Sequence, residues 1–262
     1  KLPRTPEVSE NILSRSGVSD AVRAEALAKL AEQRGVSPMK LLLSVIDSPG
    51  EVDVKGVGRL LLVQTPEALR AERAALLKLG LADTAEGRTY AWAALALADK
   101  TLDRVWQEAA ATPLSQASLL GGIPLIPDAT LRDTAFERVM PILGQAITDI
   151  QGPDNIVAAI QRDAIRSAVS TRREPAAVFA ALTVMLERGY QVPASAQGLR
   201  TLPRDSWSPA GAGRAWIALA LFAFAFALLP GMRELQALAL AATGMAQDSA
   251  AVQRGRTKFE HS

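Results

Sequence analysis

The stretch GVSDAVRAEALAKLAEQRGVS, residues 17–37, decides the fold, because one helix lies in it between two copies of the same helix-ending and helix-capping signal. Gly17-Val18-Ser19 recurs eighteen residues later as Gly35-Val36-Ser37. In each copy the glycine is suited to ending one helix, and the serine is suited to capping the next. The stretch therefore predicts short antiparallel helices joined by tight turns.

The helix inside this stretch is expected to be amphipathic, with apolar residues at helical spacing on one face. The face expected to be buried consists of Val22, Ala26, Leu27 and Leu30. The face expected to be left to water carries Asp20, Arg23, Lys29 and Glu32. A second helix is expected to begin at Pro38, a residue that suits the first helical position. Its apolar face consists of Leu41, Leu42, Val45 and Ile46.

Short helices separated by Gly, Pro and Asp continue along the chain. The segment 54–63, after a loop at 47–53, is expected to be a helix weakened by Gly56 and Gly58. Asp128 is expected to cap a helix that carries Leu131, Ala135, Val139 and Ile142. Further helices are expected at about 65–79, 88–98, 101–111, 155–169, 175–188, 215–229 and 233–248. The connections include an extended connector at 121–128, a hinge at 151–154 and a loose Pro, Gly and Ser region at 189–213.

Composition agrees with helix. Hydrophobic residues make up 49% of the 262 residues while aromatic residues make up only 5%, and the abundant Ala and Leu lose little side-chain freedom in helices. We therefore expect an all-α fold, an irregular HEAT/armadillo-like stack of antiparallel helix pairs, or α-solenoid. Pairs recur at about 36 residues, near the 40 to 47 residues of such arrays. A compact helical domain is the structural alternative.

The expected organisation follows from the segments. Residues 1–188 form a helical array, 189–250 supply its C-terminal helices, and 251–262 form a final lead-in segment.

Charge gives no sign of a nucleic-acid surface. The 29 Lys and Arg residues exceed the 27 Asp and Glu residues by a formal charge of only +2. Phosphate binding needs basic residues clustered on one face. The nearest cluster, Arg172-Arg173, is followed by Glu174 and is interpreted as a solvated helix end.

The sequence contains no catalytic constellation. It has no Cys and a single His, His261, which excludes thiolate sites and histidine metal clusters and argues against a Ser-His-Asp triad. Phosphate-loop, GxSxG and HExxH motifs are missing, and the glycine pairs at 56–58 and 211–213 are interpreted as loop or weak helix. We therefore predict no catalytic, cofactor-binding or metal-binding residue, and no cofactor in this chain. A stand-alone hydrolase or transferase would need carboxylates gathered from separate helices.

Two groups of carboxylates and two tryptophans are the remaining candidates. The carboxylates, expected to be helix caps or solvated turn residues, are Asp47, Glu51, Asp53, Asp149 and Asp154. Trp92 and Trp106 are expected to pack in the core or in a groove rather than to form a ligand platform.

The most apolar stretch is AWIALALFAFAFALL, residues 215–229, which ends at Pro230-Gly231. A membrane-spanning helix needs about twenty apolar residues, so this run is short for one. We favour burial near the C-terminal end of the array, and the side chains expected to be central there are Trp216, Phe222, Phe224 and Phe226. The alternative is a membrane-anchored helical adaptor with a single span at 215–232.

Four stretches together resemble one family. They are Trp92-Ala93-Ala94-Leu95, Leu102-Asp103-Arg104-Val105-Trp106, Ile123-Pro124-Leu125-Ile126-Pro127-Asp128 with Leu131-Arg132, and Leu199-Arg200-Thr201-Leu202-Pro203-Arg204-Asp205-Ser206-Trp207. In order and rough spacing they resemble the HEAT-like helical region of the PVC-type haem-binding CxxCH proteins. The family usually has an ordinary amphipathic helix after the last of these stretches, whereas this chain has the apolar run.

The last residues, Gly255-Arg256-Thr257-Lys258-Phe259-Glu260-His261-Ser262, resemble the lead-in of a c-type cytochrome domain. The chain also opens KLPRTPEV, without Met or a signal peptide, so we expect a piece of a longer protein. The resemblance implies a dehydrogenase-like β-propeller before this chain and a cytochrome domain carrying haem c after it. The chain would then be a non-catalytic scaffold between them in a periplasmic or secreted electron-transfer protein. Its partners would be those two neighbouring domains.

Overall fold

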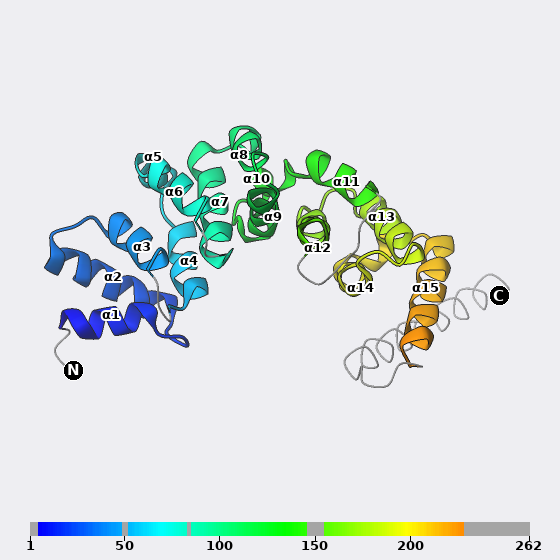
Figure 1. Cartoon of the computed structure of the whole chain (residues 1–262), viewed down its shortest axis with the longest axis horizontal. Coiled ribbons are helices and arrows are strands. Elements are labelled where there is room, and N and C mark those ends of the chain that lie inside the picture. The colour runs from blue at the N-terminus through cyan, green and yellow to red at the C-terminus, as the bar shows by residue number, and fades with distance from the viewer. Residues whose placement is uncertain (1–4, 49–51, 83–84, 146–154, 228–262) are drawn as a thin grey trace, which may run out of the picture.

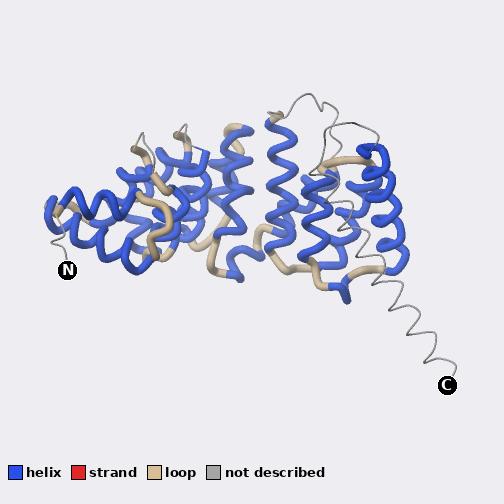
Figure 2. The backbone as a smooth tube through the Cα atoms, turned by 90° about the horizontal axis from the view of Figure 1, so that it is seen from below, coloured by secondary structure: helices blue, strands red, loops and turns tan. Residues whose placement is uncertain are grey.

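The structure, a computed structural model, describes residues 5–48, 52–82, 85–145 and 155–227. Within these ranges every regular element is a helix and no strand occurs, so the prediction of an all-α fold is confirmed. Figures 1 and 2 show the helices arranged side by side along an elongated, curved body rather than around one centre. The solenoid-like arrangement is therefore observed, and the compact alternative is not.

The helices fall into two sets that alternate along the chain, called row A and row B. Row A contains α1 (Pro6–Ser14), α3 (Pro38–Ile46), α5 (Pro66–Ala71), α6 (Arg73–Gly80), α8 (Asp103–Ala109), α10 (Ala129–Asp133), α11 (Phe136–Gly144) and α13 (Pro175–Glu187). Row B contains α2 (Asp20–Arg34), α4 (Val54–Leu62), α7 (Ala85–Asp99), α9 (Pro113–Gly122), α12 (Ile156–Ser170) and α14 (Val192–Thr201). The last described helix, α15 (Pro209–Ala227), packs on α13. In Figure 1 α8, α11 and α13 lie above α9, α12 and α14.

Contacts run both across and along the rows. Each row B helix packs against the row A helix that precedes it in sequence, as α2 does on α1 and α12 on α11. Along row B, α2 contacts α4, α4 contacts α7, α7 contacts α9, α9 contacts α12 and α12 contacts α14. Row B is therefore a continuous series of packed helices that joins the first pair to the last.

The helix-ending and helix-starting signals lie where the sequence predicts them. Gly17 and Gly35 adopt the left-handed backbone that glycine tolerates best, with φ of 78° and 63°. The hydroxyls of Ser19 and Ser37 accept bonds from the backbone N–H groups of the third residues that follow, at 3.5 Å and 3.2 Å. Pro38 lies in the first turn of α3, as expected. These glycines and serines end one helix and begin the next, so the chain reverses its direction between α1 and α2 and between α2 and α3.

The core is densest around α7, whose residues from Ala91 to Ala96 are all fully buried. This helix contacts α4, α5, α6, α8 and α9. Small residues allow the close approach: a Cβ added at Gly58 of α4 would lie 2.4 Å from the Tyr90 ring. One added at Gly122 of α9 would lie 2.7 Å from the Thr89 carbonyl oxygen. The glycines that weaken these helices locally are therefore the ones that permit their packing.

The expected faces of α2 are wrong at two positions. Arg23, expected in water, is fully buried, while Val22, expected to be buried, is 39% exposed. Ala26, Leu27 and Leu30 are buried as expected. The difference arises because Arg23 donates hydrogen bonds to acceptors on neighbouring segments. The spacing of apolar residues within α2 contains no information about those acceptors.

Two expected long helices are each divided in two. The segment 65–79 forms α5 and α6, which meet at Glu72, whose N–H bonds the carbonyl of Leu69 three residues earlier. The helix after Asp128 divides into α10 and α11 in the same way, where Ala135 N–H bonds the carbonyl of Arg132. Tight three-residue turns replace α-helical bonds at both places. The Asp128 cap itself is confirmed, since its carboxylate accepts from Leu131 N–H at 3.1 Å.

Two expected connections contain helix. In the segment 121–128 the two glycines end α9, and Ile123–Leu125 forms a 3₁₀ turn, η1. In the segment 189–213 the structure has α14, the 3₁₀ turn η2 (Arg204–Ser206) and the start of α15. Gly198 lies within α14 and packs closely on α13, since an added Cβ would be 2.9 Å from Leu182 Cδ1. Here tertiary packing outweighs the local tendency of glycine to form a loop. The expected hinge at 151–154 and the expected helix at 233–248 lie outside the described residues.

Candidate functional site

The predicted turn carboxylates have structural roles where they are described. Asp53 caps α4 by accepting from Gly56 N–H at 3.0 Å, and its other oxygen lies 2.7 Å from Arg23 Nη2. Asp47 is the C-terminal cap residue of α3. Glu51, Asp149 and Asp154 lie outside the described residues. The two described members of these groups therefore lie at helix ends, as expected.

The tryptophans and three of the four paired glycines, all except Gly213, also have packing roles. Trp92 is fully buried in α7, and Trp106 is half-buried with the Arg138 guanidinium carbon 5.8 Å from its ring centroid. Gly56 lies against Arg23, and Gly211 lies against Phe179, since added Cβ atoms would be 2.5 Å and 2.6 Å from those side chains. In the part of the chain that the structure describes, no group of three or more His, Cys, Asp or Glu side chains could hold a metal. His261 is outside that part.

The densest ionic cluster joins row A to row B. Arg73, at the start of α6, bonds Asp99 at the end of α7 and Glu108 of α8, at 2.7 Å and 2.8 Å. These two charge-assisted contacts raise the pKa of the Arg73 guanidinium above its usual range. Arg73 donates from Nε and Nη2 to Asp99 and from Nη1 and Nη2 to Glu108, so the cluster acts as a clamp between successive helix pairs.

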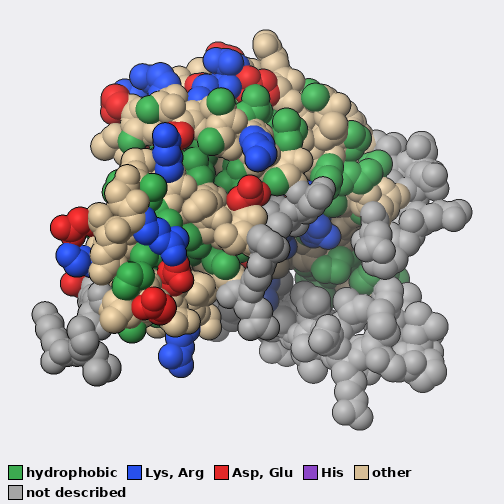
Figure 3. All heavy atoms as spheres, turned by 60° about the vertical axis from the view of Figure 1, so that its left-hand side comes forward, with side chains coloured by type: hydrophobic (Ala, Val, Ile, Leu, Met, Phe, Trp, Pro, Cys, Tyr) green, Lys and Arg blue, Asp and Glu red, His purple; other side chains and the backbone are tan. Residues whose placement is uncertain are grey.

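Opposite charges are interspersed elsewhere on the surface. Figure 3 shows Lys and Arg side chains beside Asp and Glu side chains on one face, with hydrophobic side chains scattered among them. Two exposed pairs link helices of row B: Arg59 bonds Asp20 at 2.8 Å, and Lys55 lies 3.8 Å from Glu86. On this part of row B the two signs of charge therefore alternate instead of forming a single-sign surface.

One groove differs from this mixed surface. It has a volume of about 480 Å³ and lies between the ends of α12 and α14, the start of α13, and the η1–α10 region. Three of its lining residues are the arginines Arg132, Arg172 and Arg173, and none is acidic. Its volume falls within the range of about 300–1,000 Å³ found for ligand pockets.

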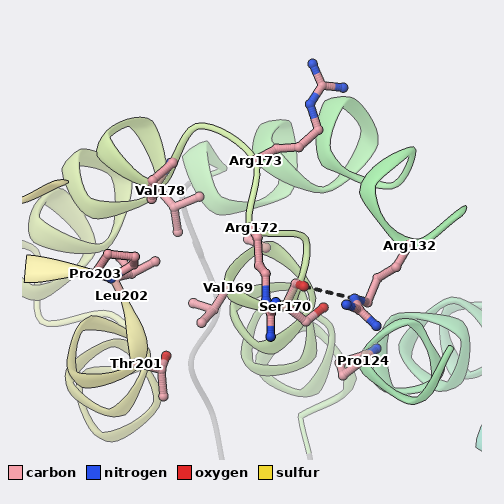
Figure 4. A pocket seen from close by; sticks show the side chains of 12 residues that line it. Pro124, Arg132, Val169, Ser170, Arg172, Arg173, Val178, Thr201, Leu202 and Pro203 are labelled. Carbon is pink, nitrogen blue, oxygen red and sulfur yellow. Dashed lines mark hydrogen bonds between the residues drawn. The ribbon is translucent and has the colours of Figure 1, made fainter. Parts of the chain in front are cut away.

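The three arginines are held differently (Figure 4). Arg132 is anchored, with Nε donating to the Ser170 carbonyl at 2.9 Å and Nη1 to the Ile126 carbonyl at 2.6 Å. Arg172 is directed toward Ser170, whereas Arg173 is directed away. Arg173 lies over the Phe136 ring, 5.5 Å from its centroid, and 3.8 Å from Glu137.

In the sequence, Arg172 and Arg173 are interpreted only as a solvated helix end. Both are exposed, in agreement with that interpretation. The sequence carried no signal that Arg132, forty residues earlier, lies beside Arg172 in one groove, because α9, α11 and α12 all contribute to that proximity.

Among its described side chains, the apolar helix α15 is buried on one side only. Ala215 is buried and Phe222 is partly buried against the core, but Ile217 and Leu221 are 63% and 65% exposed. Trp216 is half-buried rather than central, while Phe224 and Phe226 lie outside the described side chains. The expectation of burial on most sides is therefore wrong for the described part of this helix. Among the helices that the structure describes, none is both long enough and apolar enough to cross a membrane.

Comparisons with models of known protein families, with curated proteins and with solved structures find no match to this chain.

Proposed function

We propose that the chain is a non-catalytic helical scaffold that holds other protein domains at a fixed separation. The observation that carries the proposal is the unbroken packing of row B from α2 to α14, in which each helix contacts the next. A solenoid stabilised by contacts between neighbours presents long surfaces and separates its two ends, which are the properties a spacer needs. The Arg73 cluster ties α6 and α8 of row A to α7 of this series.

The domains that it separates are proposed from the resemblance to PVC-type haem-binding CxxCH proteins. The four stretches that carry the resemblance supply core residues at successive positions of the stack, including the buried Leu95, Leu102, Ile126 and Leu199. A resemblance in core positions supports a shared module more than a shared activity. On this proposal the scaffold lies between a dehydrogenase-like propeller and a c-type cytochrome in a periplasmic or secreted protein, with HEAT-like helix pairs as its repeating unit.

The proposal is tested by haem content. The natural polypeptide that contains this sequence and the isolated 262-residue chain are purified from a host that attaches haem c, and their absorption spectra are recorded after alkaline denaturation. The natural polypeptide is expected to retain covalent haem, and the isolated chain is expected to have none. A natural polypeptide without covalent haem would contradict the electron-transfer context, whereas stoichiometric haem in the isolated chain would contradict the role of a cofactor-free scaffold.

A further inference from the structure

The groove at the ends of α12 and α14 has an unbalanced charge. The two helix C-termini at its edge supply about half a negative charge each, roughly one in total. Arg132 and Arg172 together supply two positive charges, and Arg173 is offset by Glu137. The start of α13, which also lies at the groove, adds about half a positive charge, so about one and a half positive charges remain.

Arg132 is fixed in place, but its binding capacity is not exhausted. Its two hydrogen bonds go to backbone carbonyls, which are neutral acceptors, so they hold the guanidinium in orientation without cancelling its charge. No acidic side chain lines the groove. A guanidinium that is held rigidly by carbonyls is prepared to bind a carboxylate with little loss of side-chain freedom.

Arg172 is positioned by its backbone. Its φ of 56° is in the left-handed region, which is uncommon for residues with a side chain, and it separates α12 from the turn that leads to Pro175. Among the described residues no carboxylate forms an ion pair with Arg172. Arg172 and Arg132 come from opposite sides of Ser170, so an anion there could contact both (Figure 4).

Apart from the arginines, Ser170 and Thr201, the groove is lined by apolar side chains, and several of these are still accessible. The side chains that line it and remain at least partly exposed are Pro124, Val169, Pro175 and Pro203. A ligand that fills the groove must therefore place a carboxylate between the two arginines and an apolar group against the prolines and Val169. A fully charged polymer would leave this apolar wall without a partner.

We propose that this groove binds an extended peptide segment in which an Asp or Glu lies next to apolar side chains. The groove lies where the ends of α12 and α14 meet the start of α13, and stacked helical repeats use extended surfaces of this kind to bind other molecules. Such a site would give the proposed scaffold one docking contact, and in this sense the inference rests on the proposed function. The binding measurement does not involve haem, so either proposal can fail while the other stands.

The test uses an array of ten-residue peptides that combine Asp and Glu with Val, Leu, Ile and Pro. A matched array replaces every Asp with Asn and every Glu with Gln. The labelled full chain is expected to bind members of the acidic array and to lose this binding on the amide array. Absence of binding to the acidic array, or equal binding to both arrays, would overturn the proposal.

The strongest peptide is then titrated in solution by fluorescence anisotropy. Arg172→Ala is expected to weaken binding by roughly 10- to 100-fold, because it removes one side of a charged contact. Arg172→Gly tests the same loss with a residue that suits a φ of 56°. The matched control is Arg188→Ala, an exposed arginine at the other end of α13. Unchanged affinity in both Arg172 variants, or an equal loss in the control, would place binding outside this groove.

Discussion

Nη2 of Arg23 lies 2.7 Å from the Asp53 carboxylate, and this pair joins α2 to the start of α4 across thirty positions of sequence. The Arg23 side chain is fully buried, and it also donates to the backbone carbonyls of Leu13 and Arg15. One guanidinium thus connects three segments at the N-terminal end of the stack. The pair is essential to that end because a buried charge without its partner is strongly unfavourable.

Removal of the partner carboxylate should destabilise the protein. Asp53→Ala leaves Arg23 buried and also removes the cap of α4, so we expect a loss of about 2–4 kcal/mol in the free energy of unfolding. Urea denaturation followed by circular dichroism measures this loss. Asp20→Ala is the control, because it breaks the exposed pair with Arg59 and should change stability little. Equal effects of the two substitutions would show that the buried pair has no special role.

Close packing of α4 on α7 gives a prediction that opposes helix propensity. Alanine normally stabilises a helix relative to glycine by about 1 kcal/mol. At Gly58 the added Cβ would lie 2.4 Å from the Tyr90 ring, so we expect Gly58→Ala to destabilise the protein by about 1–3 kcal/mol. Gly213→Ala in α15 meets no atom within 4 Å and should be neutral or stabilising. If both variants melted at higher temperature than the parent protein, the contact between α4 and Tyr90 would be wrong.

The Arg73 clamp should require the guanidinium shape as well as the charge. Lysine retains a positive charge but cannot bond two carboxylates in the forked geometry that Arg73 forms with Asp99 and Glu108. Arg73→Lys is therefore expected to lower stability by about 1–2 kcal/mol. Arg104→Lys, at the exposed pair with Glu108, serves as the matched substitution and should have little effect in thermal denaturation. If Arg73→Lys and the parent protein had the same melting curve, the positive charge of residue 73 alone would account for its contribution to stability.

Asp163 of α12 gives a pH-dependent prediction. Burial raises the pKa of its carboxyl group, and the neighbouring Arg162 and Arg166 oppose that rise only in part. A carboxyl whose pKa is higher in the folded protein favours folding when protonated, so this favourable contribution is lost as the pH rises through the folded pKa. Asp163→Asn should therefore be more stable than the parent protein at pH 7, and the difference should shrink in acid. Denaturation at several pH values measures this, and a less stable variant at pH 7 would contradict the assigned cause.

The sequence is sufficient to predict the all-α fold and many of the residues that begin and end its helices. Capping by Ser19, Ser37 and Asp128 depends on residues within three positions, so the local sequence contains the necessary information. The same is true of the helix begun by Pro38. Together these local signals predict a series of short helices.

The errors occurred where distant contacts outweigh local preference. Gly122 and Gly198 look like loop residues in sequence, but each permits close approach of a helix far along the chain. Arg23 looks like a surface residue until the Asp53 carboxylate and two carbonyls are placed around it. Arg132 and Arg172 likewise become a candidate site only after folding brings α10 to the end of α12.

Small-angle X-ray scattering of the 262-residue chain tests the central claim, an extended helical spacer, most directly. A compact protein of this length would have a radius of gyration of about 18 Å. We expect a folded particle with a clearly larger radius and a pair-distance distribution skewed toward long distances, as the body in Figure 2 requires. A radius near that of a compact protein, with a symmetric distribution, would contradict the extended arrangement.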